Sequence, residues 1–145
     1  MVQGTLADRA ALDALFGSGR IDAVVHFAAQ TSVGESVREP LRYYRQNVGH
    51  TMNLLESMLA YGVRSLVFSS TAATYGEPRG PLTEEHPQQP VNPYGETKLT
   101  VEHILAACAK TGELSSVALR YFNACGASDD GAMGEDHDPE THLIP

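Results

Sequence analysis

Two side chains near the middle of the chain have the types and spacing needed to take a proton from a substrate hydroxyl group. Tyr94 and Lys98 are four residues apart, so on a helix they lie on one face, where the lysine ammonium can stabilise the ionised phenol. Ser69, Ser70 and Thr71 end an apolar run upstream and add hydroxyl groups. The alternative is an ordinary pair on a helix surface, but the hydroxyl-rich strand end favours an acid–base site.

Three apolar runs are expected to form the strands that position these residues. The apolar residues run continuously rather than alternating, which predicts a parallel sheet covered on both faces. Pro40 and Pro93 stand at favoured first positions of helices, and Gly17 is expected to end an earlier helix in a left-handed conformation. The expected strands are residues 22–28, 64–70 and 116–122, the expected helices are 8–17, 40–62 and 93–112, and the expected loops are 71–92 and 124–145.

This order of elements is typical of an α/β fold with an open parallel sheet. In such sheets, ligands bind beyond the carboxyl ends of the strands. All three expected strands end in small or polar residues, so a site is expected at that edge. These residues are Ala28-Ala29, Ser69-Ser70-Thr71 and Asn123-Ala124.

Composition limits the partners and the location of the protein. A length of 145 residues with 42% hydrophobic residues fits one globular domain, and a net charge of -8 with 10 Lys and Arg argues against nucleic-acid binding. Cys108 and Cys125 are too few for a disulfide framework. No apolar stretch approaches the ~20 residues of a membrane span, and the first residues do not resemble a signal peptide. We therefore expect no membrane association and a reducing, cytoplasmic location.

Six motifs spread over the whole chain resemble the extended short-chain dehydrogenase/reductase superfamily, and within it the NAD-dependent epimerase/dehydratase family. The resemblance is to its sugar-nucleotide 4-epimerases. It implies a partial doubly wound, Rossmann-like sheet over residues 1–145, with residues 124–145 beginning a substrate-side loop region. The motifs are HFAA (26–29), VGES (33–36), SSTAATYG (69–76), NPYGETK (92–98), LRYFN (119–123) and GEDHDPETHLIP (134–145).

The resemblance implies reversible C4 epimerisation of a UDP-hexose through a 4-keto intermediate with bound NAD+, as in galactose metabolism. Tyr94 would remove the proton of the sugar 4-hydroxyl, Lys98 would hold the phenolate and the nicotinamide ribose, and Thr71 would bind the sugar oxygen. Lowering the pKa of the phenol from about 10 to near 7 requires roughly 4 kcal/mol. The ammonium and the cationic nicotinamide ring are expected to provide it. UDP-glucose and UDP-galactose are the default substrates, and a UDP-pentose is the alternative within the family.

The resemblance also assigns cofactor and substrate contacts by position. The chain departs from the usual pattern at Thr5, where relatives have an acidic residue near the adenine, and at Gln46-Asn47, where many have two asparagines. Asn123, with Thr71 and Tyr94, would bind the nucleotide sugar. The expected cofactor contacts are Phe27, Ala28, Ala29, Gln30, Thr31, Gln46, Asn47, Ser69, Ser70, Tyr94, Lys98 and Phe122.

Two further features argue against dehydration of the sugar and against a metal site. Sugar 4,6-dehydratases carry an Asp-Glu pair after the catalytic threonine, whereas Thr71 is followed by Ala72 and Ala73, which move no proton. The acidic and histidine-containing segment 135–142 is expected to be a substrate-side loop rather than a metal site. His26, inside an apolar run, is expected to be a hydrogen-bonded core histidine.

A dinucleotide site of this kind begins with a strand, a glycine-rich turn and a helix, and we expect the 145 residues to lack such a unit. By the resemblance, we also expect them to lack the family's C-terminal substrate domain. The resemblance therefore predicts the middle of an epimerase, with little or no activity in these residues alone. The alternative is a catalytically silent remnant that serves as a binding or dimerisation module, because the helices from Pro40 and Pro93 resemble those of the family's homodimer.

Overall fold

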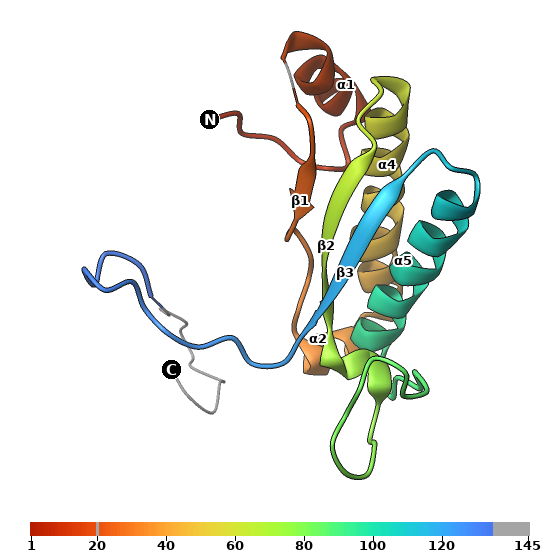
Figure 1. The fold of residues 1–145 in the computed structure, drawn as a ribbon, viewed down its shortest axis with the longest axis vertical. Helices are drawn as coiled ribbons and strands as arrows, with labels where there is room; N and C mark the ends of the chain where they lie inside the picture. The colour runs from red at the N-terminus through yellow and green to blue at the C-terminus, as the bar shows by residue number, and fades with distance from the viewer. Residues whose placement is uncertain (20, 135–145) are drawn as a thin grey trace.

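The chain forms a parallel sheet with helices packed against it, as a computed structural model that describes residues 1–19 and 21–134 shows (Figure 1). The predicted order of strands and crossover helices is confirmed. The strands are β1 (Val24–His26), β2 (Ser65–Thr71) and β3 (Ser115–Tyr121). The helices are α1 (Arg9–Ser18), α2 (Val33–Arg38), α3 (Pro40–Tyr43), the π-helix η1 (Tyr44–Gly49), α4 (His50–Ala60), the 3-10 helix η2 (Ala72–Tyr75) and α5 (Pro93–Lys110).

The sheet has the order β1-β2-β3, and both strand pairs are parallel. Val25 pairs with Val67, which pairs in turn with Val117. Parallel pairing places the carboxyl ends of the strands at one edge. The loop after β1, the hydroxyl groups at the end of β2 and the segment after β3 therefore begin along this edge.

One hydrophobic core lies between the sheet and the helices α1, α4 and α5. Leu66 and Phe68 project from β2 into this core and are each 2% exposed. Val101 and Leu105 of α5 belong to the same core and lie on the buried face of this helix. The buried residues of the core are Leu12, Phe16, Val48, Leu54, Leu55, Met58, Val63, Leu66, Phe68, Val101, Leu105 and Leu114.

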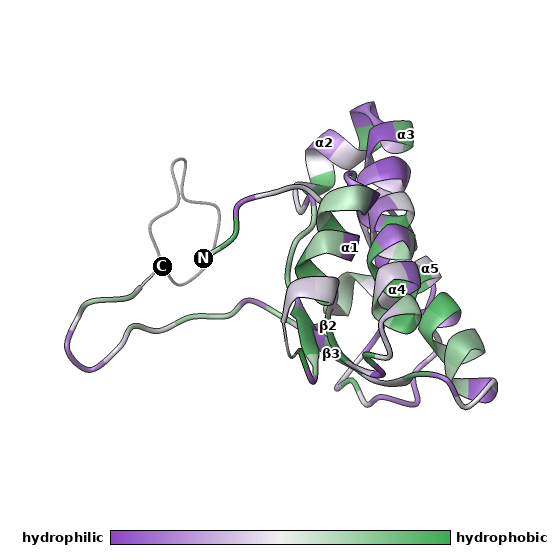
Figure 2. Ribbon diagram, turned by 90° about the horizontal axis from the view of Figure 1, so that it is seen from above, coloured by the Kyte–Doolittle hydropathy of each residue, from purple (hydrophilic) through white to green (hydrophobic). Residues whose placement is uncertain are grey.

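The predicted burial of both sheet faces is wrong for the described residues. Helices α4 and α5 lie on one side of the sheet (Figure 2). On the other face Val25 is 57% exposed, Val117 is 55% exposed and Leu119 is 38% exposed. The strands are apolar on both faces, as the sequence indicated, but within residues 1–19 and 21–134 only the face with Leu66 and Phe68 is covered.

Several element boundaries also differ from the sequence prediction. The helix expected at residues 40–62 is interrupted by the π-helix η1, and β1 covers three residues rather than the expected 22–28. Gly17 lies inside α1, and the residue that caps this helix is Gly19, in an extended conformation with φ of -147°. Residues 124–134 contain no helix or strand, in agreement with the predicted loop, and residues 135–145 lie outside the described part.

Candidate active site

Thr71 stands at the point where β2 ends and the chain turns into η2. Its side-chain oxygen accepts a hydrogen bond from the backbone N–H of Ala73 at 3.2 Å, which caps η2. The hydroxyl of Thr74 donates to the backbone oxygen of Thr71 at 3.0 Å. Because the hydroxyl oxygen of Thr71 accepts from Ala73, the hydroxyl proton of Thr71 remains available to another partner.

The start of α5 brings Tyr94 to this strand end. The side chain of Asn92 accepts a hydrogen bond from the N–H of Gly95 at 2.8 Å, and Pro93 occupies the first turn, as predicted. A Cβ atom on Gly95 would lie 2.7 Å from the backbone oxygen of Ala73. The absence of a side chain at Gly95 therefore allows α5 to approach η2 closely, next to Thr71.

Tyr94 is largely buried, and this shifts its phenol away from the ionised form. Burial raises the pKa of Tyr94 above its usual value, and a hydrogen bond from Thr71 acts in the opposite direction. The two side chains therefore lie near each other at the strand end, and their roles stay predictions. A positive charge placed beside the phenol would act against this effect of burial.

Lys98 lies below the phenol, on the same face of α5. Its ammonium donates a hydrogen bond to the backbone oxygen of Ser69 at 2.6 Å and lies 4.9 Å from the ring centre of Phe68 and 6.0 Å from that of Tyr94. Burial lowers the pKa of Lys98 to about 8. The group remains predominantly cationic at neutral pH, and it can stabilise a negative charge that develops on the Tyr94 oxygen.

A chain of hydrogen bonds connects β1 to η1 behind this site. The hydroxyl of Thr51 donates to the backbone oxygen of Asn47 at 2.6 Å, and Nε2 of His26 lies 2.9 Å from the same hydroxyl. Since the hydroxyl proton of Thr51 is already used, His26 Nε2 must be the donor. The prediction of a hydrogen-bonded core histidine is confirmed, because His26 is 4% exposed.

Asn47 fixes the loop that follows β1. Its side-chain oxygen accepts from the N–H of Gln30 at 2.8 Å, and its amide donates to the backbone oxygen of Gln30 at 3.0 Å. The amide also lies 3.1 Å from the hydroxyl of Thr97, next to Lys98. The side chain of Asn47 is occupied by protein groups, so we propose a role in cofactor binding only through the loop that it holds.

The burial of His26 predicts a pH dependence of stability. Burial, and secondarily the charge of Lys98, lowers the pKa of His26 to about 4, below the value of about 6.5 in an unfolded chain. The unfolded state therefore binds the extra proton first, and stability present above pH 6.5 is lost as the pH falls towards 4. The expected loss is up to about 3 kcal/mol. Urea unfolding of the chain between pH 4 and 7 measures it, and His26→Gln should flatten this part of the profile. Equal slopes for both proteins would contradict the assignment.

A cavity of about 520 Å³ lies where the loop after β1 meets the N-terminal segment and η1. The small side chains of Ala28 and Ala29 allow a ligand to approach the backbone, and the polar groups of Thr5, Gln30 and Gln46 provide hydrogen-bond donors and acceptors. These groups fit one half of a dinucleotide. The expected cofactor residues that line the cavity are Ala28, Ala29, Gln30 and Gln46.

Other expected site residues lie elsewhere. Phe122 is 67% exposed and lines a second cavity of about 430 Å³, together with Tyr75 and Arg120. Phe27 is 64% exposed, and Thr31 and Asn123 are also exposed. The roles of these residues stay predictions.

Ser70 does not point in the same direction as its neighbours. Its side chain is 3% exposed, and its hydroxyl donates to the carboxylate of Glu102 on α5. Sequence reasoning missed Glu102 and its partner Arg120. The signals were present, because Glu102 follows Lys98 by the same four residues that separate Lys98 from Tyr94, and Arg120 is a charge inside an apolar strand.

The described residues add two observations on other site types. In this part of the chain, no group of three or more His, Cys, Asp or Glu side chains is arranged to hold a metal ion. The segment 135–142 lies outside it. No helix within residues 1–19 and 21–134 has the length and hydropathy needed to cross a membrane.

Comparison with known proteins identifies the family. The sequence model of the NAD dependent epimerase/dehydratase family matches residues 1–145. The chain belongs to this family. A relative, UDP-glucose 4-epimerase from Halalkalibacterium halodurans, is 52% identical over 143 residues, which are 98% of this chain and 43% of the relative. The chain therefore spans less than half the length of this family member.

Solved structures of the family have the same fold. UDP-glucose 4-epimerase from Brucella ovis in complex with NAD matches with a TM-score of 0.93 and 51% identity, over 98% of this chain and 44% of that one. The UDP-glucose-4-epimerase from Stenotrophomonas maltophila, with bound NAD and formylated UDP-arabinopyranose, matches with a TM-score of 0.92 and 43% identity, over 98% of this chain and 43% of that one. The partial Rossmann-like sheet predicted from the sequence is confirmed.

Proposed function

We propose that this chain holds the proton-transfer site of a UDP-hexose 4-epimerase, which interconverts UDP-glucose and UDP-galactose. One observation carries the proposal. The side chains of Thr71 and Tyr94 lie together at the carboxyl end of β2, and the ammonium of Lys98 lies 6.0 Å from the phenol ring centre. These three groups, from two neighbouring elements, can meet a single substrate oxygen.

Each group has a distinct task in this reaction. Tyr94, as phenolate, removes the proton of the sugar 4-hydroxyl and later returns it to the oxygen of the 4-keto sugar. Lys98 stabilises the phenolate through its charge, and its bond to the backbone of Ser69 keeps the ammonium at the strand end. The hydroxyl of Thr71 donates to the same sugar oxygen and holds it against Tyr94.

The cofactor is NAD, as the family name and the NAD-bound Brucella ovis relative indicate. Bound NAD+ would supply the acceptor for the hydride of sugar C4 and the donor that returns it. The cavity lined by Ala28, Ala29 and Gln30 would hold part of the cofactor. Its positive nicotinamide ring would also favour the ionised form of Tyr94, which burial alone opposes.

The residues after Thr71 favour epimerisation over dehydration. Loss of water from the sugar requires an additional acid and base beside the oxidised carbon. Ala72 and Ala73 begin η2 at this place and carry no group that moves a proton. The 4-keto sugar would therefore accept the hydride again on its other face, with no net oxidation.

The sugar, the assembly and the location belong to the same proposal. The pentose ligand of the Stenotrophomonas maltophila relative supports a UDP-pentose as second candidate substrate.

Exposed apolar side chains along α3, η1 and α4 support the predicted homodimer. Leu41 is 79% exposed, Tyr44 is 40% exposed and Met52 is 44% exposed. We retain the predicted cytoplasmic location. The same exposed surface supports the alternative of a catalytically silent binding or dimerisation module.

A chimeric enzyme tests the proposal directly. In it, residues 1–145 replace the matching segment of the Halalkalibacterium halodurans enzyme. The purified chimera should retain NAD and interconvert UDP-glucose and UDP-galactose, measured by product chromatography, with UDP-pentoses assayed in parallel. The chain alone is measured beside it, and little or no turnover is expected there. A folded, NAD-bound chimera without epimerase activity would reject the proposed function and favour the silent module.

A further inference from the structure

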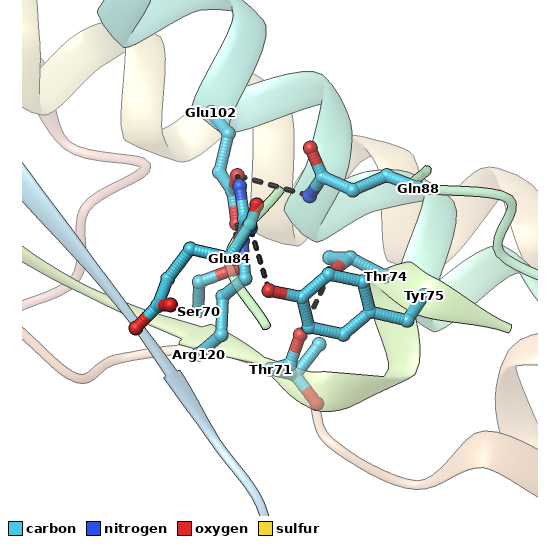
Figure 3. Close-up of polar contacts among 8 residues, drawn as sticks. All are labelled: Ser70, Thr71, Thr74, Tyr75, Glu84, Gln88, Glu102 and Arg120. Atoms are coloured by element: carbon cyan, nitrogen blue, oxygen red, sulfur yellow. Dashed lines mark hydrogen bonds and ion pairs between the residues drawn. The ribbon is translucent and has the colours of Figure 1, made fainter. Parts of the chain in front are cut away.

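Three side chains on one face of α5 contact three consecutive residues of β2. The phenol of Tyr94 meets the side chain of Thr71, and Lys98 donates to the backbone oxygen of Ser69. The third contact lies one helical turn further along α5, where Glu102 accepts a hydrogen bond from the hydroxyl of Ser70 (Figure 3). The spacing of four residues aligns all three with the end of the strand.

The carboxylate of Glu102 is held on several sides. Its side chain is 9% exposed and forms an ion pair with Arg120 of β3, at 2.7 Å between Nη2 and Oε2. The Nε group of Arg120 donates to both carboxylate oxygens, at 3.1 and 3.2 Å. The amide of Gln88 donates to Oε2 at 3.1 Å. Burial acts to raise the pKa of Glu102, but these hydrogen bonds outweigh it and hold the pKa below the usual value.

Arg120 extends the contact to the other side of the strand end. Its Nη1 group donates to the hydroxyl of Tyr75 at 2.7 Å and to the backbone oxygen of Glu84 at 3.2 Å. Tyr75 ends η2, which begins directly after Thr71. The backbone around Thr71 is therefore fixed through Ser70 on one side and through Tyr75 on the other.

We propose that Glu102 is a positioning residue that acts through Ser70 to hold Thr71 against Tyr94 in the geometry of proton transfer. The inference rests on the proposed function. Glu102 takes no part in the chemistry, because its carboxylate is enclosed by Arg120, Gln88 and Ser70 on the helix side of the sheet. Its effect reaches the site through the neighbouring residue in the strand.

A double-mutant cycle in the chimera tests this role. Ser70→Ala removes only the hydroxyl, and Glu102→Gln removes the charge. Each should lower kcat roughly ten- to a hundredfold with nearly unchanged KM and NAD affinity, because misplacement of about 1 Å has effects of this size. The double variant should lose less than the product of the two single losses, since both changes weaken the contact between Ser70 and Glu102. A purely structural role would lower stability but leave kcat unchanged below the unfolding temperature.

A matched control and a second readout make the outcome decisive. Glu56→Gln removes the exposed ion pair with Arg9 and should change nothing. In addition, the hydroxyl-bearing ring carbon of Tyr94, labelled with 13C and assigned with Tyr94→Phe, reports hydrogen bonding of the phenol without turnover. Its resonance should move in Ser70→Ala and Glu102→Gln. An inactive chimera would reject the proposed function, and an unmoved resonance or unchanged kcat in an active one would overturn the role of Glu102.

Discussion

Tyr94→Phe should reduce the epimerase turnover of the chimera by roughly 10²- to 10⁴-fold, the usual contribution of a positioned general base. The change removes one oxygen atom from a largely buried side chain, so the fold should tolerate it. The KM for the UDP-sugar should change little, because the lost contact matters mainly while the proton moves. The measurement is the initial rate with UDP-galactose at saturating substrate, at several pH values.

The pH profile separates this role from simple loss of packing. In the unchanged chimera, kcat should rise with pH as Tyr94 ionises, and this limb should be absent in the phenylalanine variant. Tyr61→Phe is the matched control, since Tyr61 is 47% exposed and caps the end of α4, before the start of β2. Full activity of Tyr94→Phe beside an active control would eliminate Tyr94 as the base.

The proximity of Tyr94 and Lys98, the proposed acid–base pair, could be predicted from the sequence because their geometry is local. Tyr94 and Lys98 lie on the first turns of one helix, whose start is fixed by Asn92 and Pro93. Their relation to Thr71 required only that strand β2 end beside that helix. A short-range pattern and one parallel crossover were sufficient to predict this contact.

The supporting contacts depend on packing that no local pattern reveals. Asn47, which bonds to Gln30, lies within the π-helix η1, and a π-helix shifts side chains away from the regular α-helical spacing. The pairing of Glu102 with Arg120 joins residues on a helix and on the next strand, and it depends on the register between β2 and β3. The spacing along the chain predicts the helix or strand on which each residue lies. It does not predict which residue of the neighbouring element each one contacts.

The fold was predictable for a related reason. Continuous apolar runs and helix starts at Pro40 and Pro93 marked the order of elements, and that order was confirmed. The elements that cover each sheet face could not be predicted in this way, because Val25 and Val117 are as apolar as the buried Leu66. Apolar character alone predicts a need for burial and does not identify the covering element.

Gly76→Ala should destabilise the chain by roughly 3 kcal/mol or more, which combines backbone strain with a severe clash. Gly76 has φ of 70° and ψ of -125°, a conformation that residues with a side chain rarely adopt. A Cβ atom there would lie 2.0 Å from the backbone oxygen of Gln89. Gln89 belongs to the segment that returns to α5, so the added atom would push this segment away from η2.

Gly80→Ala separates the two causes, because Gly80 lies in the same loop with φ of 84° but a Cβ atom would meet nothing within 4 Å. This control should cost about 1 kcal/mol, the usual penalty for the left-handed region. Urea unfolding of both variants measures the difference, and equal losses would show that the loop yields without cost. A larger loss at Gly76 implies that the return of the loop to η2 is rigid. In that case, the same rigidity keeps Asn92 and the start of α5 beside Thr71, so the loop helps to set the position of Tyr94.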